Sequence, residues 1–398
     1  MSRGFPLPAP STLKKWALKL KLSPGILKPV VHLLENSEHS DNDRVCILSF
    51  DEMKIKSVFD YYRSNDKILK PSKYMQVGMI RGLYRNWKQV IYYNFDSAMT
   101  ATILTDIIKT LKNIRFHVVA VVCDMGPTNM GLWRELDINR ENPYFLVDEM
   151  KVFTLADPPH LMKLIRNHFL DSGYVFHKEQ MEHLITSKPV VELLNLQQKE
   201  LKICHKITLI HLDVKDIARQ KVKYAVQLLS NSVSQGTKRA LSLGLITCQN
   251  VLVTSDFLKL MNDWFDLFNS SSTMKGMRER LNAFDHTNHV HQTILNDSNT
   301  LISQLRVPNK RTFLPCQKGI LVNNAALIGL SEWLWTTHGS PYILTRRIQQ
   351  DDLERFFGTI RSKGGLHDHP TALEFTYRLR NSILGRTIIF FTMILIFI

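Results

Sequence analysis

Three acidic side chains stand at the edges of segments that the sequence predicts to be buried. Asp51 ends the apolar run at residues 45–50, and Asp124 ends the longer apolar run at residues 116–123. Glu354 lies in a late segment whose apolar residues recur at helical spacing. Magnesium prefers oxygen ligands, and two divalent ions held by carboxylates can cleave or transfer a phosphodiester. The three acids are therefore candidate metal ligands for phosphoryl transfer, although each one alone is typical of an ordinary turn or surface carboxylate.

The segments around these acids predict the α/β domain that would position them. We expect strands at residues 44–51, about 54–59, 88–94, 116–124 and 152–156, and helices at residues 97–113, 127–136 and 160–170. An unbroken apolar run such as the one before Asp124 is typical of a central strand covered on both faces. This order of strands and helices is the one expected of an RNase H-like domain. Its sheet would bring Asp51 and Asp124 to a common edge.

From about residue 171 to residue 330, helical periodicity replaces the strand pattern. The clearest predicted helices are residues 218–230, 255–269 and 323–335, and the helix that carries Glu354 follows at residues 349–361. The simplest arrangement is an α/β domain that is interrupted by a mainly helical insertion and completed by the late helix.

The charge of the chain suits a polyanionic partner. Lys and Arg number 51 against 36 Asp and Glu, which gives a formal net charge of +15. A merely soluble basic surface explains the same charge equally well. Residues 1–34 carry Arg3 and five lysines but no acid, and Ser11 and Ser23 stand where helix caps are expected. This predicts a helix-turn-helix-like segment for nucleic acid, and a helical pair packed on the next domain fits the same pattern.

The cysteines and the two ends of the chain bear on its compartment. The five cysteines are far apart and form no CxxC pair, which favours reduced thiols in an intracellular compartment over disulfides or a zinc finger. The first residues lack the apolar region of a signal peptide. Residues 387–398 form an almost wholly apolar tail, shorter than the roughly 20 residues that span a bilayer. We expect no membrane partner, and a buried strand or a coding-region artefact would explain the tail.

Several groups of residues occur in an order that matches one protein family. They are residues 5–8 with 11–13, residues 49–53, residues 123–126 with Asn129 and Trp133, residues 157–161 with 166–167, and residues 350–354 with Phe356 and Phe357. With these motifs the chain resembles the P-element-type transposases, a family that includes the THAP9-like proteins of animals. The likeness runs from about residue 5 to residue 385.

The resemblance implies a fold and an activity. It implies an RNase H-like core of the DDE transposase and integrase type, in which Asp51, Asp124 and Glu354 are the catalytic residues and bind Mg²⁺ or Mn²⁺. It also implies that the helical insertion binds GTP as a cofactor that is not hydrolysed. The expected partners are transposon-end and target DNA, GTP and further copies of the chain assembled on DNA, and the expected compartment is the nucleus. The domain boundaries would be residues 1–42 for the basic segment, 43–170 and 336–386 for the core, 171–335 for the insertion and 387–398 for the tail.

The resemblance also implies which residues contact the nucleotide. Matched positions are Lys206 and Lys221 on the phosphate side with Val222 and Ser230 nearby, Phe265, Asp266 and Asn269 on the guanine side, and Asp351 as a further acid. A carboxylate can accept two hydrogen bonds from guanine while an aromatic ring stacks on the base. Without the resemblance, the lysines are typical of a solvated helix face and Phe265 of a core aromatic. The sequence holds no Walker-type GxxxxGK[ST] loop.

Two features of the sequence depart from the family pattern. The family's N-terminal THAP zinc finger needs a Cys-Cys-Cys-His set, whereas the first cysteine here is Cys46, inside the first predicted strand. The family also continues beyond the late catalytic helix. The alternatives are therefore a catalytically competent transposase core and a truncated or domesticated derivative that binds DNA or GTP without transposition. A dedicated GTPase is disfavoured because no glycine-rich phosphate loop is present.

Overall fold

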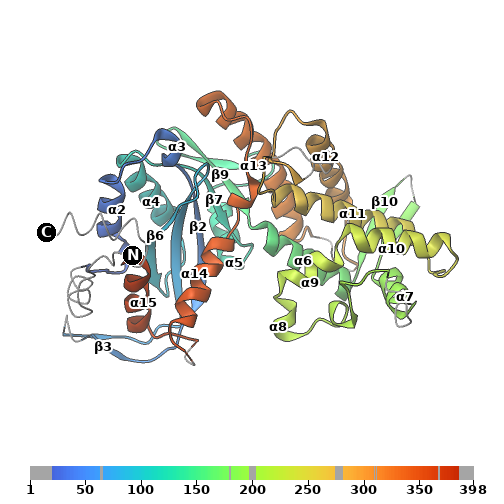
Figure 1. Cartoon of the computed structure of the whole chain (residues 1–398), viewed down its shortest axis with the longest axis horizontal. Coiled ribbons are helices and arrows are strands. Elements are labelled where there is room, and N and C mark those ends of the chain that lie inside the picture. Colours follow the sequence, from blue (N-terminus) through green and yellow to red (C-terminus); the bar gives the residue numbers. More distant parts are fainter. Residues whose placement is uncertain are drawn as a thin grey trace, which may run out of the picture. The chain divides into compact units, whose positions relative to one another are not determined.

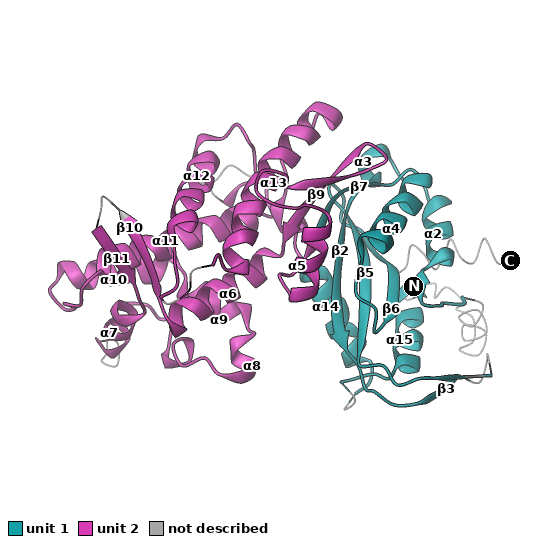
Figure 2. Ribbon diagram, turned by 180° about the vertical axis from the view of Figure 1, so that it is seen from behind, with its two compact units in different colours: residues 1–121, 350–398 teal, residues 122–349 magenta. Residues whose placement is uncertain are grey.

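The computed structural model describes residues 20–62, 66–178, 181–196, 203–273, 281–308, 310, 312–365 and 368–384. The chain forms two compact units, of which unit 1 comprises residues 1–121 and 350–398 and unit 2 comprises residues 122–349 (Figure 2). The predicted apolar tail and the first predicted helix, which ends near residue 21, lie outside or at the limit of the described residues.

Unit 1 is built on a sheet whose strands are mostly buried. Its order is β1 (Gly25–Ile26), β6 (Lys88–Phe95), β5 (Tyr74–Gly82) and β2 (Val45–Lys54), followed by β7 (His117–Cys123). Strands β1, β6, β5 and β2 pair antiparallel with one another in that order. A separate hairpin joins β3 (Asp60–Tyr62) to β4 (Lys67–Leu69). The apolar runs noted in the sequence thus form the central strands of the sheet.

Helices cover this sheet. They are α2 (Lys28–Glu35), α3 (Asp41–Arg44), α4 (Ala101–Asn113), α14 (Asp351–Ser362) and α15 (Ala372–Leu384). The hydroxyl of Thr100 caps α4 by accepting a hydrogen bond from the backbone N–H of Ile103 at 3.2 Å. Helix α14 packs against β2, and α15 packs against β6 and β3 (Figure 1). The late helix therefore completes the same unit that contains the first strands.

Two expectations for unit 1 were wrong. The strand expected at residues 54–59 is absent. The strand that lies between β2 and β6 in the sheet is instead β5, which was not predicted because polar Gln76 and a bulge after Gly78 interrupt its apolar pattern. The second basic helix begins at Lys28, not near Ser23, because Gly25 and Ile26 pair with β6 instead. Pro29 consequently lies in the first turn, where no backbone N–H is needed, and does not kink the helix.

Unit 2 begins with an α/β segment. Helix α5 (Pro127–Glu135) is followed by the antiparallel hairpin β8 (Tyr144–Val147) and β9 (Met150–Ala156), and then by α6 (Pro158–Asp171). Asp157 caps α6 by accepting a hydrogen bond from the backbone N–H of His160 at 3.0 Å. The remainder is mainly helical, as expected, and comprises the helices α7 (Lys188–Leu196), α8 (Asp216–Arg219), α9 (Val222–Leu228), α10 (Asn231–Ser242), α11 (Val251–Phe268), α12 (His289–Gln304) and α13 (Pro315–His338).

Buried amide side chains hold the long helices of unit 2 in place. The side chain of Asn323 on α13 bonds both the backbone N–H and the carbonyl of Ala156 at the end of β9, at 2.7 and 2.8 Å. The indole N–H of Trp264 on α11 donates to Asn324 at 2.8 Å. These satisfied polar contacts fix α13 against both the strand and α11.

Two details of the insertion differ from expectation. Hairpin β10 (Tyr174–Lys178) and β11 (Met181–Ile185) opens it, although the sequence predicted no strands there. Among the hairpin residues whose burial the structure describes, only Tyr174, Phe176 and Ile185 are buried, so the apolar signal is short. The helix expected at residues 218–230 is broken into α8 and α9. Within the described part of the chain, no helix is long and apolar enough to cross a membrane.

Candidate metal and nucleotide sites

Asp51 lies where β2 leaves the core of unit 1. The strand is buried from Val45 to Phe50, and exposure begins at Asp51, which stands opposite Val77 of β5. The backbone N–H of Glu52 donates to Oδ1 of Asp51 at 2.7 Å. The strand continues to Lys54, so Asp51 lies within it and not at its end as expected. Its carboxylate is thus half-exposed on a rigid element.

Glu354 is an exposed residue in the first turn of α14. The residue that caps this helix, Gln350, accepts the backbone N–H of Glu354 at 2.9 Å through its own carbonyl. The side-chain amide of Gln350 donates to the carbonyl of Phe50 at 2.7 Å. Unit 1 therefore holds the beginning of the Glu354 helix against the peptide that precedes Asp51, although the two lie far apart in the sequence.

Asp352, also in the first turn of α14, anchors the helix from its buried face. Its carboxylate pairs with Arg81 of β5 at 3.0 Å and with Lys88 of β6 at 2.5 Å. Burial alone would raise the pKa of Asp352, but the hydrogen bond from Lys88 and the charge of Arg81 leave this pKa below its ordinary value. Asp352 is therefore a charged anchor between α14 and two strands.

Asp124 belongs to unit 2 and directly follows β7. Its Oδ1 accepts hydrogen bonds from the backbone N–H of Gly126 at 2.9 Å and from the side chain of Asn129 on α5 at 2.7 Å. A Cβ on Gly126 would lie only 3.1 Å from the same oxygen, so the missing side chain gives the carboxylate its room. Two donors thus orient Asp124 at the end of a buried strand.

His160 lies near Asp124 within unit 2, in the first turn of α6. The pKa of its imidazole is lowered to about 4, because burial and the charge of Lys163 lower it by more than the charge of Asp124 raises it. The imidazole is therefore neutral near pH 7. The histidine occupies a capped helix start, and the helix begins two residues before it, at Pro158.

The donor set suits a hard divalent ion. Asp51 lies in β2 where the strand becomes exposed, Asp124 directly follows β7, and backbone or amide donors fix both carboxylates. Glu354 presents a third carboxylate from the capped start of a helix. Carboxylates held on rigid elements are the ligands that Mg²⁺ and Mn²⁺ take up. Across the described residues, no group of three or more His, Cys, Asp or Glu is gathered closely enough to form a metal site by itself.

The predicted phosphate-side residues of unit 2 lie in a turn and at the starts of short helices. Lys206 is exposed in a turn, and Lys221 is the exposed N-cap of α9, with its ammonium 5.6 Å from the ring centre of Tyr224. Val222 is the first residue of α9. The helix predicted at residues 218–230 would place Ser230 on the same helix as Lys221. This is wrong, because α9 ends at Leu228 and Ser230 caps α10.

The predicted guanine-side residues lie at the C-terminal end of α11. Phe265 is only 7% exposed, and Asp266 is half-buried and accepts a hydrogen bond from the side chain of Asn262 at 2.9 Å. Asn269 stands just beyond the helix, where its backbone N–H bonds the carbonyl of Asp266 at 3.2 Å. The side chain of Gln349 donates to the carbonyl of Phe268 at 2.7 Å and approaches Oδ1 of Asn269 at 3.4 Å. The chain segment that leads into α14 is therefore anchored at this end of α11.

The remaining predicted contact, Asp351, is the first residue of α14 and belongs to unit 1. It is half-exposed and lies 3.7 Å from the guanidinium of Arg355 one turn later. It stands next to Gln350, so any ligand bound to Asp351 would act on the same first turn that presents Glu354.

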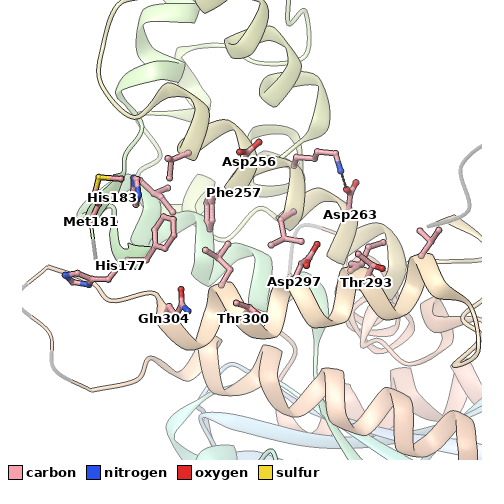
Figure 3. Close-up of a pocket in the computed structure, with 18 of the residues that line it drawn as sticks. His177, Met181, His183, Asp256, Phe257, Asp263, Thr293, Asp297, Thr300 and Gln304 are labelled. Atoms are coloured by element: carbon pink, nitrogen blue, oxygen red, sulfur yellow. Dashed lines mark hydrogen bonds and ion pairs between the residues drawn. The ribbon is translucent and has the colours of Figure 1, made fainter. Parts of the chain in front are cut away.

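A large open cavity of about 1260 Å³ in unit 2 was not predicted from the sequence. It lies between the β10–β11 hairpin, α11 and α12, and Asp256, Asp263 and Asp297 are among its polar residues (Figure 3). Asp256 pairs with Lys238 at 2.6 Å and Asp263 with Lys259 at 2.5 Å. None of the predicted nucleotide residues lines it. Its walls come from segments distant in the sequence, so no local motif marks it.

Gln350 and Asp352 also had no assigned role before the structure was known. No sequence signal marked Gln350, because it lay inside the predicted helix at residues 349–361 and its side chain bonds a strand that is distant in the sequence. No local signal marks Asp352 either, because Arg81 and Lys88 lie in strands that are distant in the sequence.

Three family models match successive parts of the chain. They are the TNP-like, RNase H N-terminal domain at residues 22–137, the TNP-like, GTP-binding insertion domain at residues 159–280 and the TNP-like, RNase H C-terminal domain at residues 347–377. The first match contains Asp51 and Asp124, and the last contains Asp351 and Glu354. The other predicted nucleotide residues fall in the insertion match.

Two curated relatives align with most of the chain. The Transposable element P transposase of Drosophila melanogaster is 40% identical over 389 residues, which covers 97% of this chain and 51% of that protein. The DNA transposase THAP9 of Homo sapiens is 26% identical over 421 residues, which covers 93% of this chain and 44% of that protein. The chain therefore spans about half the length of the curated relatives that it matches.

A solved structure, the Drosophila P element transposase strand transfer complex, has the same fold. The TM-score is 0.89 at 39% sequence identity, and the match covers 97% of this chain and 88% of that chain. This chain belongs to the P element transposase family. The expected fold class is confirmed, because RNase H-like N- and C-terminal domains of this family flank a GTP-binding insertion domain.

Proposed function

We propose that this member of the P element transposase family cleaves and joins DNA strands with a divalent metal ion, and that Asp51, Asp124 and Glu354 bind the metal. The observation that carries the proposal is the hydrogen bond from Gln350 to Phe50, at 2.7 Å. It places the first turn of the Glu354 helix on the strand that presents Asp51. Two acids from opposite ends of the sequence thus share one unit, as a metal-dependent phosphoryl-transfer site requires.

The residues of this chain would bind the metal ion and fix its position. When bound, Mg²⁺ or Mn²⁺ would activate the attacking oxygen and stabilise the leaving oxygen of the phosphodiester. The attacking oxygen would belong to water during cleavage and to a DNA 3′-hydroxyl during strand transfer. Gly126 and Asn129 fix the orientation of the Asp124 carboxylate before any ligand arrives. The neutral imidazole of His160 leaves the negative charge of Asp124 uncompensated by a histidinium.

We propose DNA as the substrate because of the charge of the chain and the cations near α14. The formal net charge is +15. A cavity of about 320 Å³ beside α14 is lined by three cations, Lys88, Arg355 and Lys363, and by the acid Asp352, which pairs with Lys88 and Arg355. Cationic side chains bind the phosphate backbone independently of base sequence. Transposon-end and target DNA are then the expected partners, on which several copies of the chain would assemble, and the nucleus is the expected compartment.

We propose GTP as a cofactor of unit 2 that is not hydrolysed. Asp266 would accept the N1–H and N2 hydrogens of guanine, and Lys206 and Lys221 would bind the phosphates. Val222, Ser230, Phe265, Asn269 and Asp351 complete the proposed set of contacts. The family match over residues 159–280 to a GTP-binding insertion domain supports this assignment.

The decisive test is metal-dependent strand transfer on pre-cleaved DNA, with the wild-type chain beside Asp124→Asn. Loss of a ligand should reduce joining by more than the 10- to 100-fold typical of losing a residue that only supports a ligand. Asp137→Asn is the matched control, because Asp137 is exposed and its positive φ of 52° suits asparagine. Equal joining by wild type and Asp124→Asn would refute the catalytic assignment. GTP and DNA binding without any joining by the wild type would instead support a derivative that only binds.

A further inference from the structure

Gln350 holds the two candidate metal-binding elements of unit 1 together. It is 3% exposed and stands directly before α14. Its backbone carbonyl accepts the N–H groups of Leu353 and Glu354, at 2.8 and 2.9 Å. Its side-chain amide donates to the carbonyl of Phe50 at 2.7 Å. One residue thus bonds both the peptide N–H of Glu354 and the peptide that joins Phe50 to Asp51.

The bond to Phe50 is a polar contact between the start of α14 and β2. Asp352 ties the same turn of α14 to Arg81 of β5 and Lys88 of β6, which fixes the helix over the neighbouring strands. Neither of those pairs touches β2. Helix α14 also packs against β2. Loss of the Gln350 amide would therefore leave the helix attached to the sheet and would remove the bond that fixes its first turn at the Phe50 carbonyl, next to Asp51. Metal ligands tolerate displacements of only about 0.5 Å from their productive geometry.

We propose that Gln350 is a positioning residue that sets Asp51 and Glu354 to bind a divalent metal ion. The proposal rests on the proposed function, because it concerns the same carboxylates. Gln350 itself contacts neither the metal nor the DNA in this scheme and acts through the Phe50 carbonyl and the first turn of α14. Glutamine suits this role because its amide reaches the carbonyl and donates to it. Asparagine is one methylene shorter, and a glutamate would oppose its own charge to the carbonyl dipole.

The test replaces the amide while keeping the volume of the side chain. Gln350→Met removes the donor from a buried position and introduces no charge. Gln89→Met is the matched control, because Gln89 is also 3% exposed in unit 1 and its amide also donates to a backbone carbonyl, that of Val90 at 3.0 Å. The full chain is titrated with Mn²⁺, and the free ion is followed by its electron paramagnetic resonance signal. Strand transfer is then measured over the same range of Mn²⁺ concentration.

Gln350→Met should weaken Mn²⁺ binding by about 10- to 100-fold, as loss of a residue that orients a metal ligand typically does. Strand transfer should then require correspondingly more Mn²⁺ and recover at high concentration, whereas Gln89→Met should leave both within about twofold of wild type. Weakening no greater than that of Gln89→Met would overturn the proposal. So would a loss of joining that added Mn²⁺ does not restore.

Two further variants keep the result interpretable. If Gln350→Met does not fold, Gln350→Asn retains a polar side chain, is too short to restore the bond, and should show the same shift in Mn²⁺ dependence. Asp51→Asn separates the two proposals. If Asp51→Asn binds Mn²⁺ like wild type, the proposed function fails and the role of Gln350 fails with it. If Asp51→Asn abolishes binding and Gln350→Met does not weaken it, only the positioning role is refuted.

Discussion

The candidate metal ligands and the candidate nucleotide contacts are held in different ways. Asp51, Asp124 and Glu354 lie on or beside long buried elements, where hydrogen bonds to backbone or amide groups fix their position. In contrast, Lys206 and Lys221 are exposed at a turn and at a helix start, and Asn269 stands just beyond the end of α11. The candidate metal ligands are thus held by rigid elements, whereas several of the candidate nucleotide contacts are exposed side chains at turns or helix ends.

The difference follows from what each ligand demands. A divalent ion requires several oxygens at closely defined distances, so its ligands gain from elements that are already in place. A nucleotide offers many separate groups along its length, and long side chains can close on it one by one. Two consecutive residues connect the candidate nucleotide contacts to the candidate metal ligands along the chain. Gln349 bonds Phe268 at the end of α11, and Gln350 bonds Phe50 in the strand that contains Asp51. Bound nucleotide is therefore expected to help fix the helix that presents Glu354.

The largest expected effect is a loss of stability in unit 1 when the buried carboxylate of Asp352 is removed. Asp352→Asn removes the charge that pairs with Arg81 and Lys88 and leaves two cations without their buried partner. Breaking such a pair should cost about 3 kcal/mol of unfolding free energy, measured by urea denaturation. Asp351→Asn is the matched control, since the Arg355 pair of Asp351 is more exposed and should be worth less than about 1 kcal/mol. Equal losses from both variants would contradict the anchoring role of Asp352.

The sequence predicted the strands and the helix that carry the candidate metal ligands better than it predicted the other elements. The strands before Asp51 and Asp124 and the helix of Glu354 carry apolar runs or periodic apolar faces, which local pattern alone detects. Strand β5 escaped detection because Gln76 and Gly78 interrupt its pattern, and their burial depends on strands distant in the sequence. The hairpin β10–β11 escaped because few of its residues are buried. Long-range packing decides such cases, and a local window does not contain it.

The candidate site residues also differ in whether a local sequence pattern indicates them. The apolar runs before Asp51 and Asp124 are conspicuous in the sequence, so the strand pattern singled out both acids together, whereas either one alone is typical of an ordinary turn or surface carboxylate. An exposed lysine such as Lys206 looks like any solvated lysine, and only resemblance to a family singled it out. Asp352 and the cavity beside α12 depend on contacts between distant segments, and nothing local indicates them. The start of α10 did carry a local signal, because serine is a usual N-cap residue and Ser230 caps this helix.

The next prediction concerns the nucleotide side of the comparison. Asp266→Ala removes the proposed charged acceptor for guanine, and loss of a hydrogen bond to a charged group should weaken GTP binding by about 10- to 100-fold. Binding of a fluorescent GTP analogue to the metal-free chain measures this change directly. Lys223→Ala is the control on α9, because Lys223 is exposed and belongs to no predicted site.

Asp266→Ala also tests the coupling between the two sites. If nucleotide helps to fix the Glu354 helix, strand transfer by this variant should lose its response to GTP. The coupling would be wrong if the variant no longer bound GTP yet joined DNA as well as GTP-bound wild type. An unchanged affinity for GTP would instead remove Asp266 from the nucleotide site.

The smallest expected effect compares how a half-buried and an exposed histidine of unit 2 change the stability of the chain with pH. Burial lowers the pKa of His168 in α6, the charges of Lys310 and Arg219 lower it further, and Asp171 opposes them. Because the folded-state pKa lies below the unfolded value of about 6.5, His168 contributes stability that is present above about pH 6.5 and is lost as the pH falls through the folded pKa. Urea denaturation at a series of pH values should show His168→Gln losing less stability on acidification than wild type, by an amount smaller than the Asp352→Asn effect. His177→Gln, on the exposed side of β10, should follow the wild-type curve, and identical curves for all three proteins would mean that His168 does not stay neutral in the folded unit.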